Sequence, residues 1–189
     1  MTNNSPAPSE TADREVIVSR TFDAPRDLVF ATFTVTRAQT IAAPAATVFA
    51  QVQDFHAWKA WSPWEKMDPN TKQTFSGGTA GVGSTYHWNG NKQVGEGEMT
   101  LTDVRASEHL GIDITFIKPF QAKNRVAFDF VPADGGTTVT WRMSGPSPFM
   151  FRLMGLFINC DKMVGGQFEQ GLAALKQISE SGSVPTQAT

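Results

Sequence analysis

One carboxylate stands at a position in the sequence where it could do chemistry. Asp161 follows Phe157 by four residues and precedes Val164 by three, so it falls on the apolar face of a predicted C-terminal helix. A buried carboxylate is destabilising unless it is paired. Two interpretations of Asp161 are possible. Asp161 orients a ligand or accepts a proton at the base of an apolar pocket, or it forms a structural pair with Arg125, Lys92 or an aromatic donor.

Three aromatic residues are further candidates. Tyr86 could move a proton if its hydroxyl group points into a pocket, which makes it, with Asp161, one of two catalytic candidates. Trp61 and Trp64 belong to the segment W-S-P-W-E and form either the rim of a pocket or the anchor of an irregular loop. Both interpretations remain open at the level of sequence.

The sequence contains no pattern typical of a covalent nucleophile, a phosphate-binding loop or a metal site. Segment 78–85 holds no G-x-S-x-G motif, and it joins two predicted strands instead of opening a helix. Cys160 has no partner base, and Glu96 and Glu98 share a strand face with threonines, which indicates solvated surface. The three histidines lack ligand spacing; they are His56, His87 and His109. We therefore assign no metal and no cofactor.

Composition narrows the class of protein. The 189 residues are 40% hydrophobic and 18% charged, which fits one globular domain with a real core. Sixteen basic and eighteen acidic residues give a formal charge of -2, too little positive charge for a nucleic-acid partner. Residues 1–15 have no apolar signal segment, no stretch is long enough to span a bilayer, and a single cysteine permits no internal disulfide. We expect a cytoplasmic protein without stable membrane insertion.

The strands and helices that would position these side chains can be predicted from changes in the spacing of apolar residues along the chain. From Lys72 the period is two, with glycines or polar clusters between the apolar stretches, which predicts a meander of antiparallel strands. The period becomes helical from about Phe151 to Ser179, and glycines within that helix predict a bend or close packing on the sheet. The expected strands are Val35–Ile41, Thr71–Phe75, Ser84–Trp88, Glu96–Val104, Leu110–Phe116, Asn124–Val131 and Thr137–Ser144.

Alternation along these strands gives the sheet one apolar face and one polar face. Burial of the apolar face against the last helix predicts an α+β domain in which a curved antiparallel sheet wraps around a long C-terminal helix. Aromatic and thioether side chains on that face favour a small-molecule pocket, and an ordinary packed core is the alternative. The candidate ligand-binding residues are Trp61, Trp64, Tyr86, Trp88, Met99, Ile114, Phe116, Phe128, Trp141, Met143, Met154, Phe157, Asp161 and Phe168.

The opening of the chain is duplicated. Segment 14–34 matches the strand and helix that follow it at an offset of 19 residues, for example at Ala24-Pro25 against Ala43-Pro44. Only one copy can fill the first position of a single sheet. The spare strand is expected to pair with a free sheet edge, either in the same chain or in a second copy as a homodimer. The predicted divisions are tail 1–13, extra strand–helix segment 14–34, domain 35–180 and tail 181–189.

Motifs along the domain together resemble a known superfamily. The START-like polyketide cyclase/dehydrase and lipid-transport superfamily, also called SRPBCC, is similar to the chain from Val35 to about Glu180. This resemblance implies the helix-grip fold and an apolar cavity, and it leaves cyclases, hydratases, carriers and sensors all open. The motifs are Ile41-Ala42-Ala43-Pro44, Trp61-Ser62-Pro63-Trp64, Gly81-Val82-Gly83-Ser84, Gly136-Thr137-Thr138-Val139-Thr140-Trp141 and Asp161-Lys162-Met163-Val164-Gly165. The first copy, with Ser19-Arg20-Thr21-Phe22, looks like the opening of relatives of a chaperone-ATPase activator that share the fold.

Three functions follow from these observations. The first is non-catalytic binding of a small hydrophobic ligand, lipid-like or polyketide-like, between the sheet and the last helix, with segment 149–157 as an apolar gate. The second is a lyase of the cyclase/dehydratase kind that uses neither a metal nor a nucleotide, with Tyr86 or Asp161 moving protons. The third is an interaction module that assists a chaperone or touches a membrane through an exposed apolar patch.

Overall fold

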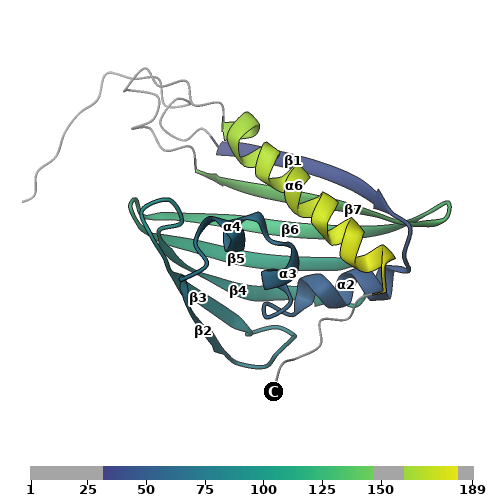
Figure 1. Cartoon of the computed structure of the whole chain (residues 1–189), viewed down its shortest axis with the longest axis horizontal. Helices are drawn as coiled ribbons and strands as arrows, with labels where there is room; N and C mark the ends of the chain where they lie inside the picture. Colours follow the sequence, from purple (N-terminus) through teal and green to yellow (C-terminus); the bar gives the residue numbers. More distant parts are fainter. Residues whose placement is uncertain (1–31, 147–159, 183–189) are drawn as a thin grey trace, which may run out of the picture.

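The computed structural model describes residues 32–146 and 160–182 of the chain (Figure 1). Its ordered core is built from one sheet and a set of helices. The strands are β1 (Thr32–Ile41), β2 (Lys72–Ser76), β3 (Thr85–Asn89), β4 (Glu96–Arg105), β5 (His109–Lys118), β6 (Ala122–Ala133) and β7 (Gly136–Pro146). The helices are α2 (Ala45–Gln53), α3 (Trp58–Trp61), α4 (Pro63–Met67) and α6 (Cys160–Glu180).

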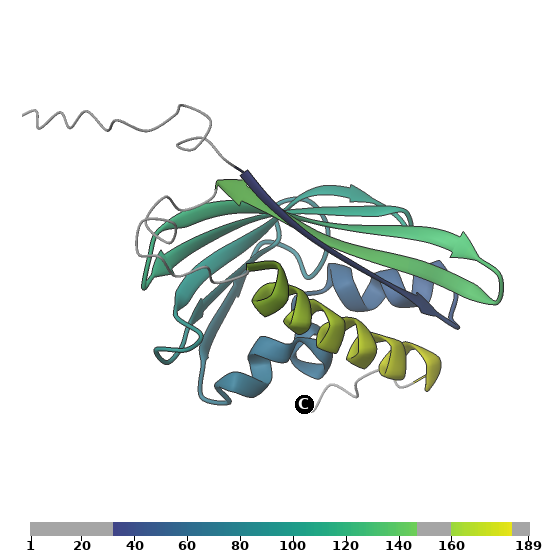
Figure 2. The same ribbon diagram turned by 90° about the horizontal axis from the view of Figure 1, so that it is seen from above.

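The strands form one antiparallel sheet in the order β1-β7-β6-β5-β4-β3-β2. β2 to β7 follow one another as a meander, and β1 joins the far side by pairing with β7. The sheet is curved, and the helices lie on one side of it (Figure 2). Helix α6 packs against β1 (Figure 1). The predicted α+β architecture, a curved sheet around a C-terminal helix, is therefore confirmed.

The observed strand bounds lie close to the predicted ones. β6 extends two residues beyond the expected strand at each end, and β2 is displaced by one residue. These shifts of one or two residues are confined to strand ends, where the assignment of boundaries ordinarily varies. Helix α6 is described from Cys160, so the part of the predicted helix at 151–159 lies outside the described residues.

The first strand and helix come from the second copy of the duplicated segment. β1 begins at Thr32, three residues before the expected boundary, and α2 follows after Pro44. The first copy, up to residue 31, lies outside the described residues. Because β1 ends the strand order, one of its edges has no strand partner within the described part of the chain.

The α3–α4 segment is anchored by its indole rings. Nε1 of Trp58 donates to the main-chain oxygen of Val52 at 2.8 Å, and Nε1 of Trp61 donates to that of Gln51 at 3.1 Å. Pro63 occupies the first position of α4, where a missing N–H breaks no hydrogen bond. The segment is therefore two short helices held against the end of α2 by these hydrogen bonds.

The core lies between the concave face of the sheet and the helices. Trp61, Phe128 and Leu172 are among its fully buried side chains. Among residues 32–146 and 160–182, no helix combines the length and apolarity needed to cross a bilayer.

Candidate functional site

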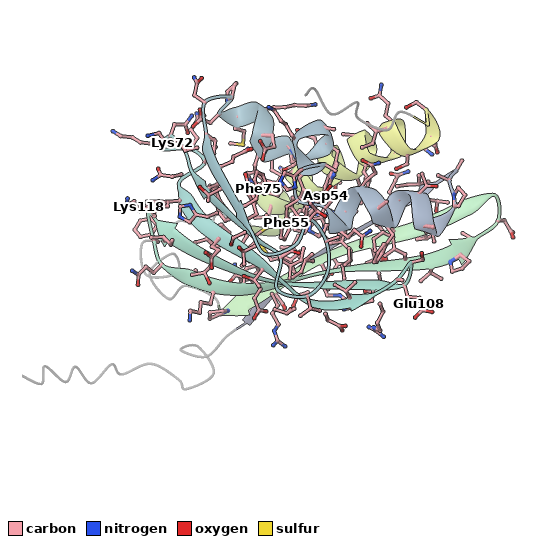
Figure 3. The ribbon with its side chains drawn as sticks, turned by 90° about the horizontal axis from the view of Figure 1, so that it is seen from below. Asp54, Phe55, Lys72, Phe75, Glu108 and Lys118 are labelled. Carbon is pink, nitrogen blue, oxygen red and sulfur yellow. The ribbon has the colours of Figure 1, made fainter. Side chains whose placement is uncertain are left out.

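A cavity of about 710 Å³ lies between the concave face of the sheet and the helices. Its wall includes side chains from β3 to β7, from α4 and from α6. The end of β5 at Lys118 and the connection to β6, residues 119–121, are exposed and also line the cavity, so the cavity opens there. Lys118 and Glu108 mark opposite ends of the sheet in Figure 3, which places this opening at the Lys118 end.

The structure brings most of the predicted site residues to this cavity. Trp61 and Phe128 pack behind the wall and do not line it. Met154 and Phe157 lie outside the described residues, and Asp161 is placed only as a backbone position in the first turn of α6. The predicted residues on the wall are Trp64, Tyr86, Trp88, Met99, Ile114, Phe116, Trp141, Met143 and Phe168.

Trp141 is held in a fixed orientation on the cavity wall. Its ring stacks on Phe168 at 4.1 Å between centroids, with an interplanar angle of 8°. Trp61 and Trp64 contact it edge-on at 5.6 and 5.8 Å. Aromatic contacts on several sides of one indole leave it little freedom to reorient. The wall around Trp141 is therefore preformed.

Three lining side chains lie directly against glycines. A Cβ atom on Gly171 of α6 would lie 2.8 Å from Cζ3 of Trp141, closer than real Cβ contacts come. A Cβ atom on Gly97 would overlap the ring of Trp88 on the neighbouring strand. Gly145 lies beneath the amide of Asn124 in the same way. Gly171 thus confirms the close packing of helix on sheet that its position in the sequence predicted.

One carboxylate is built into the cavity wall. Oε1 of Glu65 accepts a hydrogen bond from the Tyr86 hydroxyl at 2.9 Å, and Oε2 accepts one from the Gln73 amide at 2.5 Å. Glu65 and Tyr86 both line the cavity. Two donors from neighbouring strands therefore fix the orientation of a carboxylate beside a mainly apolar space.

Tyr86 acts as a donor in this cluster. Burial and the adjacent Glu65 carboxylate raise the pKa of the Tyr86 hydroxyl well above its usual range. The hydroxyl therefore keeps its proton at neutral pH. Of the two proton-moving groups considered from the sequence, Tyr86 suits the role of a hydrogen-bond donor, and its acceptor is the Glu65 side chain.

The raised pKa of Tyr86 gives an expected titration. Tyr86 is the single tyrosine of the chain, so tyrosinate absorbance reports this group alone. The folded protein should show no tyrosinate at pH about 10, the ordinary pKa of tyrosine, and the signal should appear only at higher pH or on unfolding. Because the folded pKa is the higher one, the stability gained from neutral Tyr86 is full below pH about 10 and is lost as pH rises further.

A matched variant separates the causes of this shift. Glu65→Gln removes the charge next to Tyr86 and keeps the side-chain volume, so the midpoint should move down toward the ordinary value. A midpoint near pH 10 in the folded wild-type protein would contradict the buried hydrogen bond.

The two histidines on strands, His87 and His109, lie away from the cavity. His87 faces Glu96 across 3.5 Å, and Nδ1 of His109 contacts Asp129 at 2.6 Å. Neither lines the cavity. Arg125, considered as a partner for Asp161, contacts Asp113 at 3.3 Å; the side chain of Asp161 lies outside the described residues. Within the described residues, no group of three or more His, Cys, Asp or Glu side chains is arranged to hold a metal ion.

The sequence reasoning did not single out three polar residues of the site. Glu65 lies in the five-residue helix α4, which is too short for a periodic signal. Gln73 lies on the edge strand β2, and Asn124 shares a strand face with Val126 but is polar. Asn124 and Val126 are two residues apart and so share one face of the strand, and this was the one available signal that Asn124 faces inward.

Comparison with known proteins gives the family. The family model for polyketide cyclase / dehydrase and lipid transport matches residues 32–180. The chain belongs to this family. The match spans β1 to α6 and agrees with the resemblance carried by the sequence motifs. No curated protein matches the sequence significantly.

Several solved structures share the fold of this family member, although their sequence identity to it is low. The di-domain ARO/CYC StfQ from the steffimycin biosynthetic pathway has a TM-score of 0.61 at 9% identity, over 80% of this chain and 51% of that chain. MLL2253 from Mesorhizobium loti has a TM-score of 0.57 at 19% identity, over 80% and 100%. The Aha1 dimer from Colwellia psychrerythraea has a TM-score of 0.55 at 16% identity, over 80% and 99%. These similarities show the fold.

Proposed function

We propose that the chain binds a small hydrophobic ligand, lipid-like or polyketide-like, in the cavity between the sheet and α6. The observation that carries this proposal is an open cavity of about 710 Å³ with a mainly apolar wall. Pockets of roughly 300–1,000 Å³ with mainly apolar walls are typical of small-molecule sites. The family description, which names both polyketide cyclases and lipid transport, supports the two ligand classes.

The energetics support an apolar ligand. Transfer of apolar surface from water into such a wall is favourable by roughly 25 cal/mol per Å², before the costs of association. The wall needs little ordering on binding, since Trp141 and Phe168 are already stacked. A preformed apolar wall therefore favours binding by lowering the entropic cost.

The direct test is native mass spectrometry of gently purified full-length protein, followed by solvent extraction and identification of the released molecule. A stoichiometric apolar ligand supports the proposal. An unliganded mass, together with no binding of the fluorescent probe N-phenyl-1-naphthylamine, contradicts it.

A second candidate function is a cyclase or dehydratase reaction, and the Glu65 cluster favours it. A carboxylate beside an apolar cavity can take a proton from the carbon next to a ketone, the step that begins such reactions. Tyr86 and Gln73 hold Glu65 in place for this role. Proton transfer of this kind needs neither a metal nor a nucleotide cofactor.

Deuterium exchange tests this second candidate. In D₂O, the wild-type protein should catalyse exchange of the methyl protons of 2-acetylnaphthalene. Glu65→Gln should lower the exchange rate about a hundredfold or more, since it removes the base, while leaving the affinity for the ketone nearly unchanged. Exchange at the solvent rate with wild-type protein, or equal rates for both proteins, contradicts a role for Glu65 in proton transfer.

Two further proposals concern the duplicated segment at the start of the chain and the location of the protein. We propose that the spare strand, predicted within segment 14–34 and now limited to residues 14–31 because β1 begins at Thr32, pairs with the β1 edge in the same chain or in a homodimer. We also propose that the protein acts in the cytoplasm. The dimeric relative from Colwellia psychrerythraea supports the homodimer. The oligomeric state of the full chain and of a chain lacking residues 1–31 tests it: an unchanged state contradicts the dimer. Microscopy of a fluorescent fusion tests the location.

A further inference from the structure

The cavity wall carries a negative charge that no basic side chain of the described residues balances. Of the described residues that line the cavity, two are charged, Glu65 and Lys118. Nζ of Lys118 contacts Oε2 of Glu96 at 2.6 Å, and Glu96 does not line the cavity, so the charge of Lys118 is balanced from outside. Within the described part of the chain, no ion pair involves Glu65.

The groups bonded to Glu65 orient its carboxylate and carry no charge. Both oxygens accept hydrogen bonds, Oε1 from the Tyr86 hydroxyl at 2.9 Å and Oε2 from the Gln73 amide at 2.5 Å. This is the pattern of an ionised carboxylate, which accepts hydrogen bonds and donates none. Burial raises the pKa of the Tyr86 hydroxyl, so Tyr86 stays neutral, and an amide is always neutral.

Glu65 also has acceptor positions to spare. A carboxylate can accept about four hydrogen bonds, and Tyr86 and Gln73 fill two of these positions. Glu65 is half-buried and lines the cavity, so a donor on a bound molecule can reach it. A donor that also carries a positive charge would balance the carboxylate as well as bond to it.

The aromatic residues near Glu65 favour a cation too. Trp64 precedes Glu65 in α4, and the ring of Trp88 lies 5.9 Å from that of Tyr86; all of these residues line the cavity. The faces of aromatic rings are negative and attract an ammonium group. Beside a mainly apolar wall, the attraction of a carboxylate for a cation is also screened less than it is at an open surface.

We infer that the ligand of this cavity carries a primary or secondary ammonium group on its apolar body, and that this group pairs with Glu65. The inference rests on the proposed function and specifies its ligand. A hydrocarbon or an alcohol would leave the carboxylate unbalanced. A fatty acid would place a second negative charge in the same cavity, so the cavity should select against it.

Matched naphthalene probes test the inference, by displacement of N-phenyl-1-naphthylamine from the full chain at neutral pH. 2-(Aminomethyl)naphthalene and 2-naphthylmethanol have the same shape and differ in charge. Glu65→Gln removes the charge of the wall and keeps the side-chain volume. It should lower the affinity for the amine about tenfold or more, and it should leave the affinity for the alcohol nearly unchanged.

Glu98→Gln is the matched control. Glu98 is exposed on β4 and does not line the cavity, so this variant changes the net charge of the chain by the same amount elsewhere. It should leave both affinities unchanged. A loss of amine affinity equal to that of Glu65→Gln would mean that the amine responds to the overall charge of the protein, and the inference would be wrong.

A comparison on the wild-type protein does not depend on the folding of any variant. The wild-type protein should bind the amine most tightly, then the alcohol, and 2-naphthoate most weakly. If N-phenyl-1-naphthylamine binds but the amine and 2-naphthoate bind equally, the ligand inference is wrong and water serves the Glu65 carboxylate. If N-phenyl-1-naphthylamine does not bind, the proposed function itself fails.

Discussion

Trp61→Ala is expected to lower the free energy of unfolding by about 3–5 kcal/mol, because it removes a large ring from a fully buried position. The ring contacts Trp58 at 4.7 Å and Trp141 at 5.6 Å, and its Nε1 group ties α3 to the end of α2. Loss of the ring leaves a void among stiff aromatic neighbours that cannot collapse to fill it. Urea denaturation followed by circular dichroism measures the change.

Trp64→Ala is the matched control for this prediction. Trp64 is a half-buried residue that lines the cavity, so its removal enlarges an existing space instead of opening a new void. We expect a loss of about 1–2 kcal/mol, with a weaker affinity for apolar probes. Equal losses of stability for the two variants would show that Trp61 and Trp64 belong to one packed core and not to a core and a wall.

Ala122→Phe should block ligand entry. Ala122 begins β6 beside the exposed connection 119–121 and lines the cavity, so a phenyl ring there projects into its opening. We expect the affinity for N-phenyl-1-naphthylamine to fall at least about tenfold, because the ring and the probe compete for the same apolar space. Fluorescence titration measures the affinity.

The control for the blocked opening is Ala127→Phe. Ala127 is on the same strand, an odd number of residues from Ala122, so it lies on the opposite face of the sheet. It pairs with Arg142 and does not line this cavity. The substitution adds the same ring to the outer face and should leave the probe affinity unchanged. A similar loss in both variants would place the probe on the surface and contradict the cavity as its site.

The sequence predicted the fold well because its signals are long and regular. β4 to β7 are ten to twelve residues long, and the central part of each strand alternates between buried and more exposed positions with a consistent apolar face. One face of a meander must meet the helix that follows it, so the architecture followed from the pattern alone. The pattern could not show which copy of the duplicated segment forms the first strand of the sheet, because both copies carry the same local signals.

The apolar wall of the site could be predicted, whereas its polar groups could not. Trp88, Met99 and Phe116 were correctly predicted to line the cavity, because alternation along their strands assigns them to the inner face. The role of Glu65 depends on Tyr86, which is 21 residues away and reaches it only after β3 has formed. Asn124 lies on the inward face of β6, but its polar side chain interrupts the apolar pattern by which that face is recognised in the sequence.

The three glycines beneath Trp88, Asn124 and Trp141 bear on how freely this chain can vary. Alanine is ordinarily the mildest replacement for glycine in a helix, but at Gly171 its single methyl group would push against the wall of the cavity. The same holds on the sheet at Gly97 and Gly145. The shape of the cavity is thus encoded partly by residues that contribute no side chain to it, and a homologue with larger residues at these positions would need a differently shaped cavity and a different ligand.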